Sequence, residues 1–540
     1  MKAGNRRLGI SRKFLALSCS ASVAAFLAVG CGGGGVTSTP PPPPPRQDFS
    51  LSVNPSTISM TVGTISPPVL ISVVGQNGFS GAVNVAITGL PPGGISSPAS
   101  PLVLSVGVKQ ALLFIPPTTP TGSLSIEFNA SNGSLSHSAA LNLTVTPVSG
   151  TAVLQDASGP APDGTIEIQG LSAGVFTPTN WQHDTLNWVP DVRLPMLAPK
   201  TTGPYQNIYA PWPLEQPGGW RLFYGGWDGQ DVPFDQIFSV TTSDFLSFQN
   251  RNLVIAHGAF ENVNNVNVQQ LPDGSMHMIC TAGIYPFAKP AYFSSPDGVT
   301  WNGSLEPYEA QLADIIDIQG YAEYQSGIFN GANVLFRDNN SWVFYFLGPD
   351  NNNNGQVFRA VGDSPHTFQL TGIALPMGDE PNDVKKFVVG NQSWYLMGLM
   401  SNAPQLWYSL SNDGLTFLPE QTLFPHQSLQ DLSMDSLGFV TSGSRLLGVL
   451  YGANTGSRDN QQADNKIFAR WLQKRVILID SAGSTYAAQG GYGPDRQWFP
   501  APASGFLEGT MVVYAEDSVT LLGSSFVTLT SGKAYTLVLK

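Results

Sequence analysis

Asparagine and aspartate residues recur at matching places in the middle of the chain. They are Asn207, Asn264, Asn330, Asn382 and Asp435, each 11 to 13 residues before Trp220, Met276, Trp342, Trp394 and Leu446 respectively. A side-chain amide offers donors and an acceptor to the hydroxyl groups of a polyol such as a sugar. The spacing therefore favours a ligand-binding funnel lined by these side chains. The same residues could instead cap strands by bonding to the backbone, and the sequence leaves both interpretations open.

Aromatic residues near the first of these positions suit the same kind of ligand. Tyr209, Trp212 and Trp227 could supply flat faces that stack on sugar rings at a partly wet rim. Metal chemistry is not indicated, because the six histidines show no ligand spacing and no paired-cysteine motif occurs. We expect no cofactor and no metal, and nothing in the sequence supports a calcium ion in a central channel.

The polar positions belong to a repeated unit. Aromatic residues end four similar turn segments at positions 248, 301, 368 and 417, and a fifth aromatic follows at 471; the mean step is about 56 residues. Apolar strand segments precede each of them, and further strands precede those. Five copies of a unit with at least three strands predict a five-bladed β-propeller over residues 190–480. In such a fold the innermost strand of each blade lines a central channel, where the polar residues would converge.

Two segments within this rhythm, 234–248 and 295–301, resemble the five-bladed glycoside hydrolases, the clan that includes arabinanases, xylosidases and invertases. The resemblance implies an oligo- or polysaccharide ligand and catalytic carboxylates on the first strands of the first three blades. By register those places are Asn207, Asn264 and Asn330. Amides do not ionise near neutral pH, so they can neither accept a proton nor attack an anomeric carbon. Whether the chain is an enzyme is therefore left open.

If the chain hydrolyses carbohydrate, its acids come from other positions. Asp383 and Asp435, on neighbouring blades, are the first candidates for the pair. Glu261 and Glu323, in loops that enter the second and third blades, are the reserves. Each of the four could instead be a structural hydrogen-bond acceptor. The alternatives to an enzyme are a glycan-binding protein without activity, and a surface adhesin or scaffold that binds protein partners.

The first thirty residues are typical of an export signal. Five basic residues precede an apolar run over 14–29, which is too short for a membrane span. Residues 27–31 resemble a bacterial lipobox, which implies cleavage before Cys31 and lipidation of its thiol; ordinary cleavage is the alternative. Residues 31–47, rich in glycine and proline, read as a tether. We expect an exported monomer, anchored by its lipid to the bacterial membrane, on the outer membrane or cell surface.

The other segments also predict strands, so the fold class is all-β. Residues 48–147 alternate with period two and predict an immunoglobulin-like β-sandwich that serves as a spacer. Residues 148–189 form a connector that we expect to pair with a small C-terminal sandwich over 481–540. Only 11% of residues are charged, which argues against long solvated helices. The net charge of −12 makes nucleic acid an unsuitable partner.

Overall fold

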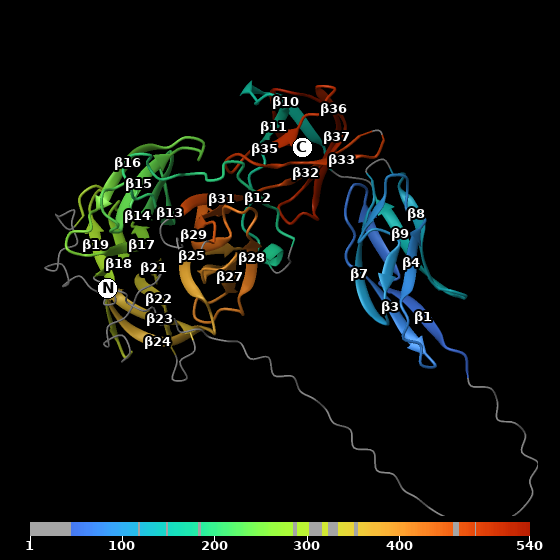
Figure 1. The fold of residues 1–540 in the computed structure, drawn as a ribbon, viewed down its shortest axis with the longest axis horizontal. Helices are drawn as coiled ribbons and strands as arrows, with labels where there is room; N and C mark the ends of the chain where they lie inside the picture. Colours follow the sequence, from blue (N-terminus) through green and yellow to red (C-terminus); the bar gives the residue numbers. More distant parts are fainter. Residues whose placement is uncertain are drawn as a thin grey trace, which may run out of the picture. The chain divides into compact units, whose positions relative to one another are not determined.

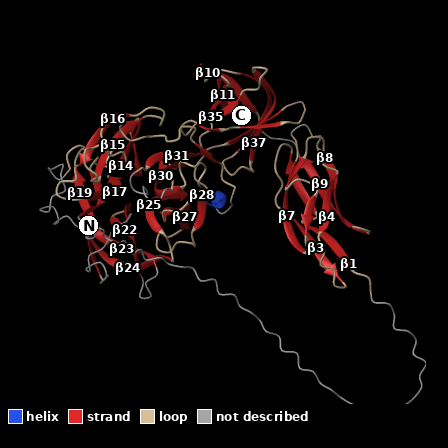
Figure 2. Ribbon diagram, viewed as in Figure 1, coloured by secondary structure: helices blue, strands red, loops and turns tan. Residues whose placement is uncertain are grey.

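The computed structural model describes residues 45–116, 119–146, 150–181, 185–283, 289–301, 316–321, 333–349, 355–456, 464–480 and 482–540. Strands dominate these residues, and their one helix is the short α1 (Pro178–Trp181) (Figure 2). No helix in the described ranges is long and apolar enough to cross a bilayer. The predicted signal segment, Cys31, most of the tether, Glu323 and Asn330 lie outside the described residues.

Residues 48–146 form two sheets that share one apolar core. Alternation produces this arrangement: on β3, Val69 and Ile71 are buried whereas Leu70 is exposed, because successive side chains point to opposite faces of a strand. One sheet contains β1 (Asp48–Asn54), β3 (Val69–Gln76), β7 (Gly107–Phe114) and β5 (Ile95–Ser97). The other contains β2 (Thr57–Thr61), β9 (Leu135–Thr146), β8 (Gly122–Asn132), β4 (Val83–Thr88) and β6 (Leu102–Leu104).

Five further sheets follow one another along the described part of residues 188–472. The first two are β13 (Ile208–Gln216), β14 (Gly219–Gly226), β15 (Gln236–Thr242) and β16 (Gln249–Ile255), then β17 (Asn262–Gln270), β18 (Met276–Gly283) and β19 (Lys289–Ser295). The third is β21 (Asn333–Asp338), β22 (Ser341–Pro349), β23 (Gly355–Ser364), β24 (Thr367–Pro376) and β20 (Asp317–Gln319). The fourth is β25 (Glu380–Val389), β26 (Gln392–Met400), β27 (Gln405–Ser411) and β28 (Gln421–Pro425). The fifth is β29 (Ser433–Ser442), β30 (Arg445–Asn454), β31 (Lys466–Leu472) and β12 (Trp188–Pro190).

The first strands of these sheets contact one another in a cycle. β13 contacts β17, β17 contacts β21, β21 contacts β25, β25 contacts β29, and β29 returns to β13 (Figure 1). The strand β12 comes before the first sheet in the sequence, yet it pairs with β31 as the outermost strand of the fifth. The two ends of this region are therefore joined within one sheet.

The last described strands form a second sandwich together with β10 and β11, which precede the five sheets in the sequence. We call the five sheets, whose first strands contact one another in a cycle, the ring. Its sheets are β10 (Ala152–Pro160), β38 (Lys533–Leu539), β11 (Thr165–Gln169), β35 (Gln497–Pro500) and β34 (Gly490–Gly491), and β33 (Thr485–Ala487), β32 (Arg475–Ile479), β36 (Phe506–Tyr514) and β37 (Leu521–Thr530). β11 runs parallel to β38 and antiparallel to β35. Ile166, Phe499 and Met511 lie in its core.

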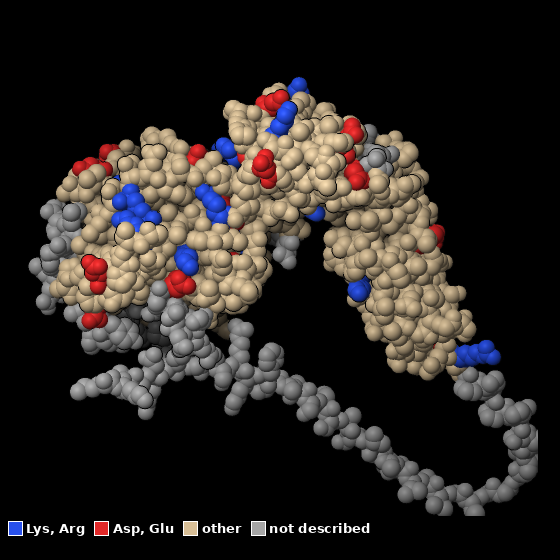
Figure 3. Space-filling model, turned by 45° about the horizontal axis from the view of Figure 1, so that its top comes forward, with Lys and Arg blue, Asp and Glu red and all other residues tan. Residues whose placement is uncertain are grey.

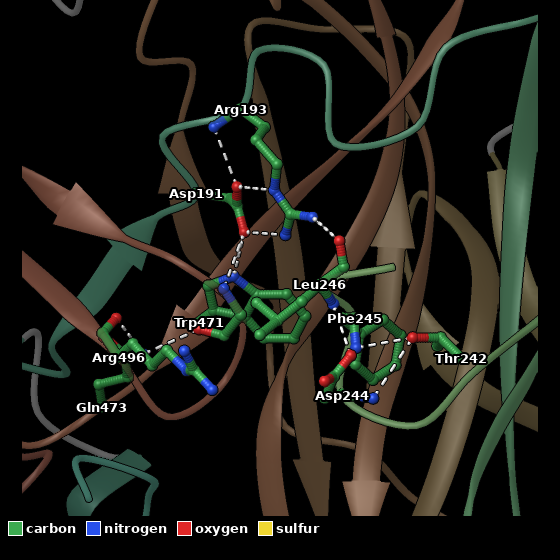
Figure 4. A network of polar contacts seen from close by, with 10 residues as sticks. Asp191, Arg193, Thr242, Asp244, Phe245, Leu246, Trp471, Gln473 and Arg496 are labelled. Carbon is green, nitrogen blue, oxygen red and sulfur yellow. Dashed lines mark hydrogen bonds and ion pairs between the residues drawn. The ribbon is translucent and has the colours of Figure 1, made fainter. Parts of the chain in front are cut away.

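A buried carboxylate joins this sandwich to the ring (Figure 4). Asp191 directly follows β12 and accepts hydrogen bonds from the indole nitrogen of Trp471, at 2.8 Å, and from the backbone of Gly493, at 3.2 Å. Arg193 forms an ion pair with the same carboxylate at 2.8 Å. Charged side chains are otherwise sparse and scattered over the face shown in Figure 3.

Candidate functional site

The first strands of four sheets carry a β-bulge near the residues that the sequence singles out. The register shifts lie between Tyr209 and Trp212 on β13, Asn264 and Asn267 on β17, Pro381 and Asp383 on β25, and Met434 and Ser436 on β29. Ala210 and Asn265, with φ of 50° and 54°, have left-handed backbone conformations. A bulge redirects side chains away from strict alternation. Each of these strands can therefore turn polar side chains toward the other first strands.

Asp235 lies at the centre of the first polar group. The hydroxyl of Tyr209 donates to Asp235 Oδ2 at 2.7 Å, and Asn264 Nδ2 donates to the same oxygen at 2.9 Å. Asn264 Nδ2 also donates to the Tyr209 hydroxyl oxygen at 2.8 Å. Burial raises the pKa of Asp235 to about 6, although both hydrogen bonds act to lower it.

The segment that leads to Asp235 is fixed by its own contacts. Asp228 is buried at the end of β14 and accepts hydrogen bonds from Tyr224, at 3.1 Å, and from Arg251. The backbone N–H of Asp235 donates to the carbonyl of Glu261 at 3.2 Å. The loop thus holds the Asp235 carboxyl in place without a regular strand.

Asp435 is the extra residue of the bulge on β29. Its Oδ1 accepts from the hydroxyl of Ser436 at 2.6 Å, and its Oδ2 accepts from Asn465 Nδ2 at 3.1 Å. Burial raises the pKa of Asp435 to about 6, and the negative charge of Asp235 contributes to the rise. The two carboxyls are therefore close enough to repel each other.

Gly452 on β30 shows how tightly these groups are packed. A Cβ atom at this position would lie 2.6 Å from Asp435 Oδ1 and 2.9 Å from Tyr209 Cβ. Asp435 and Tyr209 thus lie side by side against the same glycine. Burial, followed by the charges of Asp235 and Asp435, raises the pKa of Tyr209 well above its usual value. We name the six residues that meet here the hub cluster: Tyr209, Asp235, Asn264, Asp435, Ser436 and Asn465.

Two of the predicted amides have a structural role. Asn207 is buried, and its Oδ1 accepts from the backbone of Asn465 at 2.9 Å. Asn382 Oδ1 accepts from the backbone of Leu437 on the neighbouring sheet at 2.9 Å. The interpretation as backbone-bonding residues therefore holds for these two, whereas the side chain of Asn264 belongs to the hub cluster.

Asp383 does not form the expected pair with Asp435. It is fully buried, and its Oδ2 accepts from the backbone of Phe439 at 2.8 Å and lies 3.1 Å from Lys385 Nζ. Burial raises the pKa of its carboxyl, and Lys385 opposes this. One oxygen of Asp383 therefore ties β25 to β29, whereas the carboxyl whose charge acts on Asp435 is that of Asp235.

The side chains of the other predicted residues that the structure describes, Glu261, Trp212 and Trp227, are not part of the hub cluster. Glu261 exposes its side chain and contributes its backbone carbonyl to Asp235. Trp212 is 1% exposed and donates to the carbonyl of Val268, so it offers no stacking face at a rim. Trp227 is half-buried and packs edge-on against Tyr205.

Asp235, Ser436 and Asn465 were missed by reasoning from the sequence. Asp235 and Asn465 each directly precede a strand, β15 and β31, that is not the first of its sheet. The only sequence signal for Asp235 is its place in the segment 234–248, which carries the resemblance to the hydrolases.

The chemistry available to the cluster is proton transfer and hydroxyl binding. In the described ranges no group of three or more His, Cys, Asp or Glu side chains could hold a metal ion. Two carboxyls with pKa values of about 6 can each hold or release a proton near neutral pH. The negative charge of Asp235 favours the protonated form of Asp435.

No model of a known protein family matches the chain, and no curated protein matches it. Among solved structures, a glycosyl hydrolase from Bacteroides ovatus has a TM-score of 0.39 at 10% identity, covering 56% of this chain and 96% of that one. The catalytic domain of a GH62 alpha-L-arabinofuranosidase from Coprinopsis cinerea has 0.38 at 14%, covering 54% and 97%. A family 117 glycoside hydrolase from Zobellia galactanivorans has 0.37 at 12%, covering 54% and 91%. At TM-scores below 0.5 these similarities add nothing to the assignment of the site.

Proposed function

We propose that the five sheets are the blades of a closed five-bladed propeller, and that its hub cluster binds carbohydrate and hydrolyses a glycosidic bond. The observation that carries the proposal is the pair Asp235 and Asp435: two buried carboxyls whose pKa values burial raises to about 6, with the charge of Asp235 adding to the rise at Asp435. Glycoside hydrolysis needs one carboxyl that holds a proton and a second that is ionised. The amides and hydroxyls around the pair suit the hydroxyl groups of a sugar.

The test is turnover of a panel of plant and microbial oligosaccharides by the full chain, followed by chromatography. Asp235→Asn and Asp435→Asn, which preserve side-chain shape, should each lower turnover by about 100-fold or more. Asp163→Asn, at an exposed position far along the chain from the cluster, is the matched control and should retain activity. Full activity in either cluster variant would refute the role of the pair.

Carbohydrate binding without turnover is the second candidate. It is favoured by the amides at Asn207 and Asn264, which occupy positions where the resembling hydrolases carry carboxylates. Calorimetry with the same oligosaccharides distinguishes the two functions, because a binding protein shows heat of binding and no product. A protein-binding scaffold would show neither, and no sugar would raise its melting temperature.

We further propose that the chain is exported and lipid-anchored through Cys31, with residues 48–146 as an immunoglobulin-like spacer. The basic and apolar leader and the lipobox-like residues 27–31 support this proposal. Labelling of cells with a fatty-acid analogue should mark the protein, and Cys31→Ala should abolish the label. If the unaltered protein is exported at the same size but does not carry the label, the proposed lipid anchor is contradicted.

A further inference from the structure

We propose that Asp235 Oδ1 and Asn264 Oδ1 form a two-point subsite that binds two hydroxyl groups of the ligand. The inference deepens the proposed function, since it identifies the atoms that would recognise the sugar. It rests on the hydrogen-bond inventory of the hub cluster rather than on the reactivity of the acid pair.

Both oxygens are buried and have no hydrogen-bond partner among the described residues. Asp235 is 8% exposed and Asn264 is 7% exposed, so solvent has little access to either side chain. Buried polar atoms are nearly always paired in native proteins, and each exception calls for an explanation. A buried acceptor without a donor destabilises the protein, and a ligand hydroxyl would remove that cost.

The opposite ends of the same two side chains are firmly held. Asn264 Nδ2 donates to Asp235 Oδ2 at 2.9 Å, and the Tyr209 hydroxyl donates to that oxygen at 2.7 Å. Neither head group can rotate to pair its free oxygen without breaking these bonds. Because the two head groups are joined by a hydrogen bond, their free oxygens are fixed relative to each other.

Two acceptors held in fixed positions can bind two hydroxyl groups of one ligand. Asn264 Oδ1 can only accept, so it binds the hydrogen of one hydroxyl. Asp235 Oδ1 accepts the second hydroxyl when the carboxyl is ionised and donates to it when the carboxyl is protonated. A hydroxyl is both donor and acceptor, so the second contact is kept in both protonation states.

The experiment is calorimetry of the full chain with neutral monosaccharides and with sorbitol, an acyclic polyol with adjacent hydroxyls. The best-binding sugar is then compared with its single-deoxy derivatives. One or two derivatives should bind the unaltered protein about 5- to 100-fold more weakly, the range expected when a buried acceptor is left unpaired. In Asn264→Leu, of similar shape and without the amide, at least one of these penalties should fall to about twofold or less.

The result that overturns the subsite is an Asn264→Leu protein that discriminates among the deoxy sugars as the unaltered protein does. Binding of no sugar and no polyol by the unaltered protein overturns it as well. If Asn264→Leu does not fold, Asp235→Leu, which removes the polar atoms of the second contact, gives the same comparison for the second hydroxyl. Turnover is measured separately: binding with the expected deoxy pattern and without product leaves the subsite intact and refutes hydrolysis.

Discussion

Polar residues at or beside the first strands divide into two kinds. Asn207 and Asn382 bond to the backbone of a neighbouring segment, whereas Asn264 and Asp435 turn their side chains into the hub cluster. Period-two reasoning cannot separate the two kinds, because β17, β25 and β29 are bulged at or beside Asn264, Asn382 and Asp435, and Asn207 precedes β13. The sequence was thus sufficient to find the region of the first strands where the site lies, but not the orientation of each side chain.

Burial of Asp235 predicts a specific pH dependence of stability at the residue scale. Its pKa is raised from 3.8 to about 6 in the folded chain, so folding favours the protonated form. Stability is therefore highest below the unfolded pKa and is lost as pH rises through the folded pKa, by about 3 kcal/mol for this group. Asp235→Asn removes the titration. We take the free energy of unfolding of Asp235→Asn minus that of the unaltered protein. This difference should increase by about 2–3 kcal/mol as the pH rises from about 4 to about 7.

Urea unfolding at a series of pH values measures this difference. The exposed Asp163→Asn control should show no such pH-dependent gain. A constant difference between Asp235→Asn and the unaltered protein across the range would mean that Asp235 is not desolvated by the fold.

At the scale of elements, two turns with the pattern Ser-x-Asp-Gly-x-Thr-aromatic repeat the same contacts. Asp297 Oδ1 accepts from the backbone of Val299 and Thr300 at 2.8 and 2.9 Å, and Asp413 Oδ1 accepts from Leu415 and Thr416 at 2.8 and 3.0 Å. The carbonyl of Gly414 also accepts from the Tyr345 hydroxyl of the preceding sheet at 2.7 Å. The repeated turns therefore connect neighbouring sheets as well as the strands of one sheet.

Asp413→Ala removes an acceptor shared by two backbone N–H groups of its turn. We expect the free energy of unfolding to fall by about 1–2 kcal/mol, as for the loss of comparable side-chain caps. Asn412→Ala, one residue earlier and exposed, is the control and should change stability by less than about 0.5 kcal/mol. Equal urea midpoints for the two variants would contradict a structural role for Asp413.

The elements themselves were largely predictable. Turn residues and apolar runs placed the strands because a half-buried strand and its turns leave a strong local pattern. Asp235 was not predictable in this way, since it lies in the irregular segment between β14 and β15, where no periodicity operates. Its position depends on long-range contacts with Tyr209, Asn264 and Glu261, which no local pattern encodes.

At the scale of the whole molecule, Asp191 is the point where the strand β12, the fifth sheet and the C-terminal sandwich meet. Asp191→Ala would leave the Arg193 guanidinium and the Trp471 indole N–H without their acceptor in a buried place. We expect a loss of about 3–5 kcal/mol, the range for breaking one side of a buried ion pair. Chemical unfolding measures it, with Asp231→Ala on the exposed loop as the control. A loss below 1 kcal/mol would show that this joint is dispensable.

The pairing of β10 and β11 with β35 and β38 has a consequence for biosynthesis. Residues 152–169 leave the ribosome more than three hundred residues before their hydrogen-bonding partners over 497–539. Until translation ends, these early strands have unpaired backbone edges, which are sites of aggregation. A product that stops near residue 480 would keep those edges exposed permanently, so premature termination should yield insoluble material and not a shorter functional protein.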